Sequence, residues 1–217
     1  MPRTKPAPTS HTLVLLVRHG TTPSTGTVLP GRAKGLHLSD HGRAQADAAA
    51  ARIAALARVD AVYASPLERT RETAAPIARS RGRPVVTDRG LLECDFGEWT
   101  GAELKRLMKL AEWRTVQRSP SVFRFPGGES FVEMQSRGVA SVNRLASAHR
   151  GGVIVCVSHA DPIKAIVAHA IGTHLDLFQR IVISPCSITA LAVSADTAPI
   201  VLTVNSTGES LSELVPS

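Results

Sequence analysis

The chain has 217 residues and a mass of 23.0 kDa, with 43% hydrophobic and 20% charged residues and a formal net charge of +7 at pH 7. This composition is typical of a single globular domain and excludes disordered, collagen-like and coiled-coil chains. No apolar run approaches the roughly 20 residues that span a bilayer, and the first one, Leu13 to Val17, is too short for the apolar core of a signal peptide.

The cysteines and the charge indicate the compartment and the partners. Cys94, Cys156 and Cys186 form no CxxC pair, which fits a reducing compartment, so we expect a cytoplasmic protein that makes no membrane contact. The positive charge suits small phosphorylated anions as partners. Nucleic acid is not expected, because the sequence has neither zinc-finger spacing nor basic residues interleaved with aromatic ones.

The first third of the chain predicts a tail, a strand and a helix. Residues 1–12 are rich in proline and predict a flexible tail. The apolar run 13–17 predicts a strand that is buried on both faces. After a loop to about residue 38, the pattern predicts a helix over 40–58 with Ser39 as its N-cap, and a strand over 60–64.

The middle of the chain predicts mainly helices. Ser65-Pro66-Leu67-Glu68 predicts a helix start, with Ser65 as N-cap, Pro66 at the first helical position and Glu68 completing a capping box. Two short extended pieces are expected at 85–86 and 91–92. The later elements are a helix over 100–113, a loop over 114–128, a helix over 129–149, a strand over 153–157, a helix over 161–171 and strands over 188–193 and 200–204.

Strands therefore alternate with helices, which predicts an α/β fold. We expect three layers, with a mostly parallel central sheet flanked by helices. The sequence contains no internal repeat and no linker that would divide it, so we expect one catalytic domain over 13–207 and a C-terminal tail over 208–217.

Reactive side chains follow three of the predicted strands. Arg18 and His19 end the first strand, Ser65 follows the second with Arg69 one helical turn later, and Ser158 and His159 end the strand 153–157. Parallel strands bring these ends to one edge of the sheet, where α/β proteins bind ligands. Arginine binds phosphate oxygens bidentately, a neutral imidazole can attack phosphorus, and a protonated imidazole can stabilise the transition state. The sequence therefore predicts a phosphate site.

A phosphate site that cleaves an ester also needs an acid for the leaving oxygen. The segment after Leu92 offers Glu93, Asp95 and Glu98. A carboxyl group beside a phosphate dianion has a raised pKa, because like charges disfavour ionisation, and it can then donate a proton. The spacing alone does not select one of the three.

Together these segments resemble the histidine phosphatase superfamily, which includes the cofactor-dependent phosphoglycerate mutases. The resemblance covers most of residues 13–205 and implies a mixed sheet flanked by helices, with no metal or other cofactor. Its motifs occur in the expected order: Arg18-His19-Gly20 (RHG), Ser65 to Ala74 (SPLxRxxxTA), Leu91 to Gly101 (LxExxxGxxxG), Phe125 to Ser130 (PGGES) and Val157-Ser158-His159.

The resemblance implies a role for each matching residue. His19 is the phosphorylated nucleophile, Glu93 the general acid and His159 the second catalytic histidine. Arg18, Arg69 and Thr22 bind phosphate together with the backbone of Ala160, and Thr25, Glu129 and Asp161 are candidate substrate contacts. Glu129 is also a candidate cap, with Ser130, for the helix 129–149.

Two positions depart from the family pattern. Thr25 stands where the family often has Asn, and Ala160 stands where Gly is usual. Ala160 would be strained if the site needed a positive φ there, and harmless if the position only offers its N–H.

The leading hypothesis is a phosphomonoester hydrolase that forms a phosphohistidine on His19. A phosphoglycerate mutase dependent on 2,3-bisphosphoglycerate is the alternative, although the mutases have Arg-His-Tyr after the catalytic Glu and an Arg pair further on. Here Cys94-Asp95-Phe96 follow, and no Arg-Arg pair occurs. A phospho-ligand binder without catalysis is the third hypothesis. Residues 97–130 are the expected insert over the pocket, and their mixed aromatic and basic content leaves open whether they cover a substrate or form a homodimer contact.

Overall fold

The predicted strands form one central sheet, with the order β3-β2-β4-β1-β5-β6. The computed structural model describes residues 11–208, so most of the two predicted tails, 1–12 and 208–217, lies outside the described residues. The strands are β1 (Thr12–Arg18), β2 (Ala61–Ala64), β3 (Val85–Thr87), β4 (Val153–Ser158), β5 (Ile188–Val193) and β6 (Ile200–Ser206). β1 to β4 are mutually parallel, whereas β5 runs antiparallel to both β1 and β6. The mostly parallel sheet is thus confirmed.

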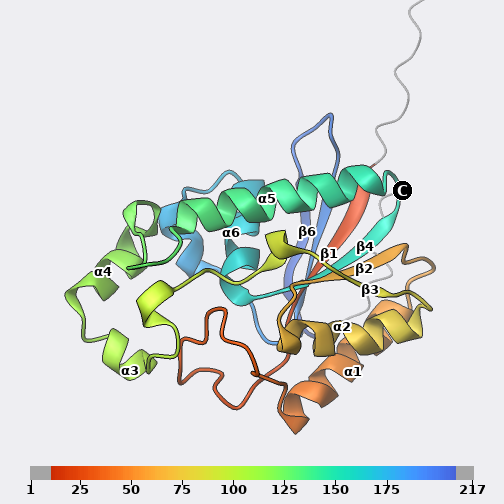
Figure 1. Ribbon diagram of the computed structural model, residues 1–217. Helices are drawn as coiled ribbons and strands as arrows, with labels where there is room; N and C mark the ends of the chain where they lie inside the picture. The colour runs from red at the N-terminus through yellow and green to blue at the C-terminus, as the bar shows by residue number, and fades with distance from the viewer. Residues whose placement is uncertain (1–10, 209–217) are drawn as a thin grey trace, which may run out of the picture.

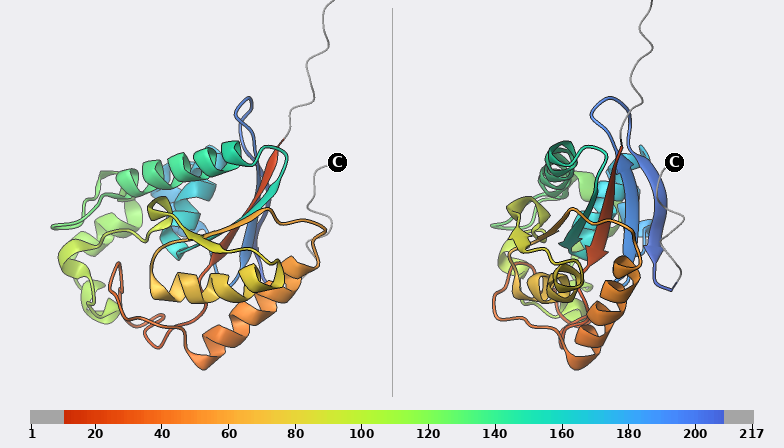
Figure 2. Two further views of the ribbon diagram at one scale, coloured as in Figure 1. Left: turned by 45° about the vertical axis from the view of Figure 1, so that its right-hand side comes forward. Right: turned by 90° about the vertical axis from the view of Figure 1, so that its right-hand side faces the viewer.

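Helices cover both faces of this sheet (Figures 1 and 2). One layer contains α1 (Asp40–Ala54) and α2 (Glu68–Ser80), and the other contains α5 (Phe131–Ala148) and α6 (Ala160–Ala170). Side chains of a strand alternate between faces. Leu13, Leu15 and Val17 therefore join the core with α1 and α2, while Val14 and Leu16 join the core with α5 and α6. This confirms the three layers.

Two predicted helix starts had different outcomes. Ser39 caps α1 as predicted, because its Oγ accepts a hydrogen bond from Gly42 N at 3.0 Å. The capping box at Ser65 is wrong: α2 begins at Glu68, and Leu67 precedes it without a side-chain cap. Ser65 Oγ instead lies 2.9 Å from His159 Nε2 on the neighbouring strand end. The hydroxyl of Ser65 therefore makes a tertiary contact instead of the helix cap that the local pattern predicted.

The predicted continuous helix over 100–113 is also wrong. The chain forms the 3₁₀ turn η2 (Gly97–Trp99), the short helix α3 (Leu104–Leu107), α4 (Ala111–Arg118) and the 3₁₀ turn η3 (Pro120–Val122). Gly101 has a φ of +84° and Leu110 is extended, with ψ at 144°, so neither continues a helix. Much of the region that we expected to be a loop, 114–128, is therefore helical.

The other predicted elements occur with shifted ends. The helix predicted to reach residue 58 ends at Ala54, and Leu91 closes the 3₁₀ turn η1 (Arg89–Leu91) instead of being extended. A further 3₁₀ helix, η4 (Leu175–Arg180), follows α6. Over residues 11–208, every helix is too short or too polar to cross a membrane.

Backbone contacts join the loop after β1 to the 97–130 segment. The loop and the segment lie side by side in Figures 1 and 2. Leu29 N donates to Ala102 O at 2.9 Å and Leu104 N donates to Thr27 O at 2.9 Å. The end of the segment, just before α5, returns to the chain that precedes the segment, where Glu129 N donates to Asp95 O at 2.9 Å. A Cβ at Gly128 would lie 2.3 Å from Asp95 O, so this close approach requires glycine. The position of residues 93–98 is thus fixed by the main chain.

Gly42 allows a second close approach, which supports the loop after β1. It lies in the first turn of α1, and a Cβ there would lie 2.0 Å from Thr21 O. Gly→Ala inside a helix normally stabilises by about 1 kcal/mol. We expect Gly42→Ala to lower the free energy of unfolding by about 1–3 kcal/mol, as overpacking does, in urea denaturation.

Gly138→Ala in α5 is the matched control. The added Cβ would lie 3.2 Å from Ile166 Cδ1, at the end of a flexible side chain. We expect a change within about 1 kcal/mol of wild type. Equal effects at both positions would contradict the steric account.

Candidate active site

The site forms at the carboxyl ends of three adjacent strands, β2, β4 and β1. Arg18 ends β1 and Ser158 ends β4, and these two residues are paired in the sheet register. The next residue on each strand is a histidine. The His19 and His159 rings lie edge to face with 5.2 Å between centroids, and His19 N donates to Ser158 O at 3.0 Å. The sheet order therefore brings the two histidines together.

The surroundings of His19 suit a nucleophile. Its ring is buried, and Nδ1 lies 2.7 Å from Gly20 O. Because a carbonyl oxygen only accepts, this hydrogen bond places the ring proton on Nδ1 and leaves the lone pair on Nε2. Burial, with the nearby charges of Arg69 and Arg18, lowers the pKa of His19 to about 3. The imidazole is therefore neutral at pH 7 and can attack phosphorus from Nε2.

Two guanidinium groups, of half-buried Arg18 and completely buried Arg69, face this edge of the sheet with incomplete hydrogen bonding. Arg18 Nη1 donates to Ile183 O at 2.6 Å, and Arg69 Nη2 donates to Gly31 O at 2.7 Å. Within residues 11–208, buried Nε of Arg18 and buried Nε and Nη1 of Arg69 have no hydrogen-bond partner. Burial lowers the pKa of both groups, but arginine stays charged in proteins. An anion with several oxygens would satisfy these donors.

His159 is completely buried between Ser65 and the cationic groups. Burial lowers its pKa well below the usual value, and the charge of Arg69 lowers it further. The free protein thus differs from the protonated second histidine that the sequence predicted. When Ser65 Oγ–H donates to Nε2, the proton of the neutral ring lies on Nδ1, so the ring can still donate to an anion.

The first turn of α6 directly follows His159. Ala160 is the first residue of this helix, and among the non-glycine residues of 11–208 only Cys186 and Asn205 have a positive φ. Alanine is therefore unstrained at position 160, which decides between the two alternatives that the sequence left open. The first amides of a helix lack partners within the helix and favour anions. Asp161 lies in this turn and pairs with Lys164 Nζ at 3.3 Å.

Among the three candidate acids, only Glu93 is buried. Its Oε1 accepts a hydrogen bond from Cys94 N at 2.9 Å. Burial raises the pKa of Glu93 to about 7, and the nearby charge of Asp161 contributes, while Arg69 and Arg18 oppose the rise. Asp95 instead pairs with Arg32 at 3.3 Å, and Glu98 is exposed. Glu93 is thus the carboxyl group that can hold a proton near neutral pH.

The remaining predicted residues have partners within the chain. Thr22 is buried, its N–H donates to Thr25 Oγ1 at 2.9 Å, and the two hydroxyl oxygens lie 3.0 Å apart. Ser130 caps α5 in a capping box with Glu133, as predicted for Ser130, but Glu129 takes no part in this cap. The Glu129 carboxylate instead binds two arginines.

Several residues of this site are not among the predicted ones. Ser65 was assigned to a helix cap, although it contacts His159. Thr73 Oγ1 accepts from Gly20 N at 3.0 Å, and its spacing of four residues from Arg69 on α2 could have indicated this. Arg32 and Arg137 contact the main chain at Glu93, and no local pattern signals that contact.

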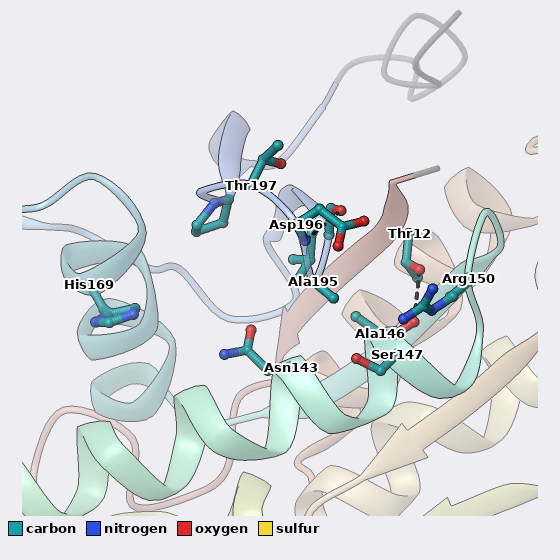
Figure 3. A pocket seen from close by; sticks show the side chains of 12 residues that line it. Thr12, Asn143, Ala146, Ser147, Arg150, His169, Ala195, Asp196 and Thr197 are labelled. Carbon is teal, nitrogen blue, oxygen red and sulfur yellow. Dashed lines mark hydrogen bonds between the residues drawn. The ribbon is translucent and has the colours of Figure 1, made fainter. Parts of the chain in front are cut away.

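A hollow of about 390 Å³ lies at the opposite edge of the sheet, where β1 begins. Figure 3 shows its lining, which includes Thr12, Asn143, Arg150 and Asp196. None of the predicted site residues lines this hollow. In the described part of the chain, no three His, Cys, Asp or Glu side chains converge as a metal site would require.

Most of this chain matches a known protein family. Residues 14–206 match the family model described as histidine phosphatase superfamily, branch 1. A bifunctional protein of Mycobacterium tuberculosis is 33% identical over 212 residues, which cover 91% of this chain and 54% of that protein. The chain thus spans about half the length of that curated relative and of two further mycobacterial relatives with the same coverage.

One further relative and one solved structure cover most of their own length. Glucosyl-3-phosphoglycerate phosphatase of Mycolicibacterium vanbaalenii is 30% identical, over 75% of this chain and 76% of that protein. The solved structure of a mycobacterial hydrolase superposes with a TM-score of 0.82 at 25% identity, and the match covers 90% of this chain and 99% of that one.

The low pKa of His19 predicts an effect of pH on stability. The unfolded chain protonates this ring below about pH 6.5, whereas the native state protonates it only near 3. Between these values the unfolded state binds one more proton, so His19 lowers the free energy of unfolding by about 1.4 kcal/mol for each pH unit of acidification. Denaturant unfolding of wild type and His19→Asn at pH 7, 6 and 5 should show the steeper loss in wild type. Parallel curves would contradict a buried neutral His19.

Ser65→Ala tests the contact between Ser65 and His159. Without the hydroxyl, the tautomer and orientation of the His159 ring are no longer fixed, so we expect inorganic phosphate to bind about 10-fold more weakly, by loss of a hydrogen bond to a charged group. Isothermal titration calorimetry measures the binding. Ser80→Ala is the control: it removes a hydroxyl that donates to Ile77 O within α2, and it should leave phosphate binding unchanged. Equal binding in all three proteins would exclude this role for Ser65.

Proposed function

Because this chain belongs to the histidine phosphatase superfamily, we propose that it is a phosphomonoester hydrolase that forms a phosphohistidine on His19. One observation carries the proposal: a neutral His19 with its Nε2 lone pair available lies beside two arginines, Arg18 and Arg69, whose buried N–H groups are unused donors. A nucleophile beside positively charged groups that can bind an anion is suited to attack on a phosphate ester.

In the first step His19 Nε2 attacks the phosphorus atom and the bond from phosphorus to the ester oxygen breaks. Arg18, Arg69 and His159 hold the phosphoryl oxygens, helped by Thr22 and the first amide of α6 at Ala160. The buried Glu93 carboxyl gives its proton to the departing oxygen, which leaves as an alcohol.

In the second step water attacks the phosphohistidine. The Glu93 carboxylate formed in the first step accepts the proton of that water. The bond from phosphorus to Nε2 breaks, inorganic phosphate leaves, and His19 returns to its neutral state. The cycle needs no acid or base beyond Glu93.

Two observations favour a hydrolase over a mutase. One relative at 30% identity, the protein of Mycolicibacterium vanbaalenii, is a glucosyl-3-phosphoglycerate phosphatase. Cys94 and Phe96, which follow the acid where mutases carry Arg-His-Tyr, are buried in the apolar cluster with Phe125 and offer no charge to a substrate carboxylate. We therefore propose a small phosphorylated substrate, and a phosphorylated glycerate is the first candidate because that relative acts on one.

Leaving-group dependence tests the assigned roles. We expect His19→Ala to abolish phosphate release from all substrates. Glu93→Gln should slow an alkyl phosphate such as 3-phosphoglycerate by about 10²–10⁴-fold and slow p-nitrophenyl phosphate much less, because nitrophenolate leaves without a proton. In wild type, alkyl phosphate turnover should fall as pH rises through about 7, and this decline should vanish in Glu93→Gln. Steady-state phosphate release from pH 5 to 8 measures all three effects.

Other outcomes would support the alternatives. Turnover retained by His19→Ala would exclude the phosphohistidine route. Turnover of phosphoglycerate that depends on added 2,3-bisphosphoglycerate would indicate a mutase. Tight phosphate binding with neither phosphohistidine nor phosphate release would indicate a binding module.

A further inference from the structure

Two arginines far apart in the sequence hold the main chain at Glu93. Arg137 of α5 donates from Nη1 to the carbonyl oxygens of Gly90 and Leu92, each at 2.9 Å, and from Nη2 to Glu93 O at 3.4 Å. Arg32, in the loop after β1, donates from Nε to Glu93 O at 2.9 Å. These bonds end on the backbone, so they fix the point from which the Glu93 side chain starts.

Glu129 joins the two arginines. Its Oε2 accepts from Arg32 Nη2 at 2.9 Å and from Arg137 Nη2 at 2.8 Å, and its Oε1 accepts from Arg137 Nε at 2.9 Å. The Glu129 side chain is 14% exposed. Two guanidinium groups that share one carboxylate oxygen would repel each other without its negative charge. Glu129 is therefore needed for both arginines to occupy these positions.

The same residue holds the chain on the other side of the acid. Glu129 N donates to Asp95 O at 2.9 Å, and Glu129 Oε2 lies 3.3 Å from Asp95 N. Arg32, Glu129 and Arg137, called the clamp below, thus contact the main chain at four positions: Gly90, Leu92, Glu93 and Asp95.

We propose that the clamp positions the general acid, by holding residues 90–95 so that the Glu93 carboxyl stays buried at the leaving-group oxygen. The proposal rests on the proposed hydrolase function. It makes Glu129, expected from the sequence as a substrate contact, a positioning residue that acts through Glu93.

The clamp should matter unequally for different substrates. A substrate with a poor leaving group needs the proton of Glu93, and a misplacement of about 1 Å can cost about 10²-fold in rate. A substrate with a good leaving group needs only His19 and the phosphate pocket. A general loss of folded structure would slow both substrates equally, so the ratio of the two rates separates positioning from stability.

The experiment compares two clamp variants with a matched control. Glu129→Gln removes the shared charge, whereas Arg137→Lys keeps the charge and loses the fork that reaches several acceptors. Arg124→Gln is the control, because Arg124 binds Gly128 O in the same loop and Glu133 in the first turn of α5, but is exposed and does not contact residues 90–95 in the described structure. All variants are checked by thermal unfolding.

The kinetic readout is kcat/KM for 3-phosphoglycerate and for p-nitrophenyl phosphate. We expect both clamp variants to lose about 30–100-fold on the alkyl phosphate and less than about 3-fold on the aryl phosphate, and the control to match wild type with both. Equal losses on the two substrates, or no loss, would overturn the proposal.

A second readout needs no turnover, so it decides the proposal even if the hydrolase function fails. Difference infrared spectroscopy follows the titration of the Glu93 carboxyl, which is identified by the loss of its band in Glu93→Gln. The pKa of about 7 in wild type should fall by at least about one unit toward 4.5 in Arg137→Lys, because the released carboxyl reaches solvent. Since that variant keeps its charge, an unchanged titration would overturn the proposal.

Discussion

Arg69 is a completely buried cation, and the electrostatics of the whole site depend on it. A buried guanidinium that has donors to spare favours an anion and disfavours any further positive charge. Burial lowers the pKa of His19 and His159 most, and the charge of Arg69 lowers both further, so the proposed nucleophile His19 stays unprotonated. In the proposed mechanism, this charge would also stabilise the negative phosphoryl group that the imidazole attacks.

At Glu93, desolvation raises the pKa by more than the nearby arginines lower it. Arg69 and Arg18 favour its ionised form, yet burial and the charge of Asp161 raise its pKa to about 7. The proposed nucleophile His19, without a proton, and the proposed acid Glu93, with one, can therefore coexist at neutral pH within one cluster. The pKa of Glu93 depends on its short distances to these groups. Hydrogen bonds from Arg32, Arg137 and Glu129 to the backbone hold residues 90–95, which carry Glu93, in place.

Much of the fold was predictable because its signals are local. Short apolar runs predicted the positions of the strands, and Ser39 predicted the start of α1. The alternation of strands and helices predicted three layers, with one sheet between two layers of helices. The errors occur where local propensity competes with a distant partner. Ser65 has the pattern of a helix cap but its hydroxyl contacts His159, and the single helix expected over 100–113 is interrupted at Gly101 and Leu110, which adopt non-helical dihedrals.

The reactive residue types and the strand ends that carry them could be predicted from contiguous residues, because strand periodicity and motif spacing are local properties. Their protonation depends on the folded chain, since burial and nearby charges, including those of Arg18 and Arg69, set the pKa values of His19 and Glu93. The tertiary structure also decided that Ala160 is unstrained and that Glu129 joins Arg32 to Arg137. The physical reason is that desolvation and hydrogen bonding depend on neighbours in space, and the contact of Glu129 with Arg32 spans 97 residues of chain.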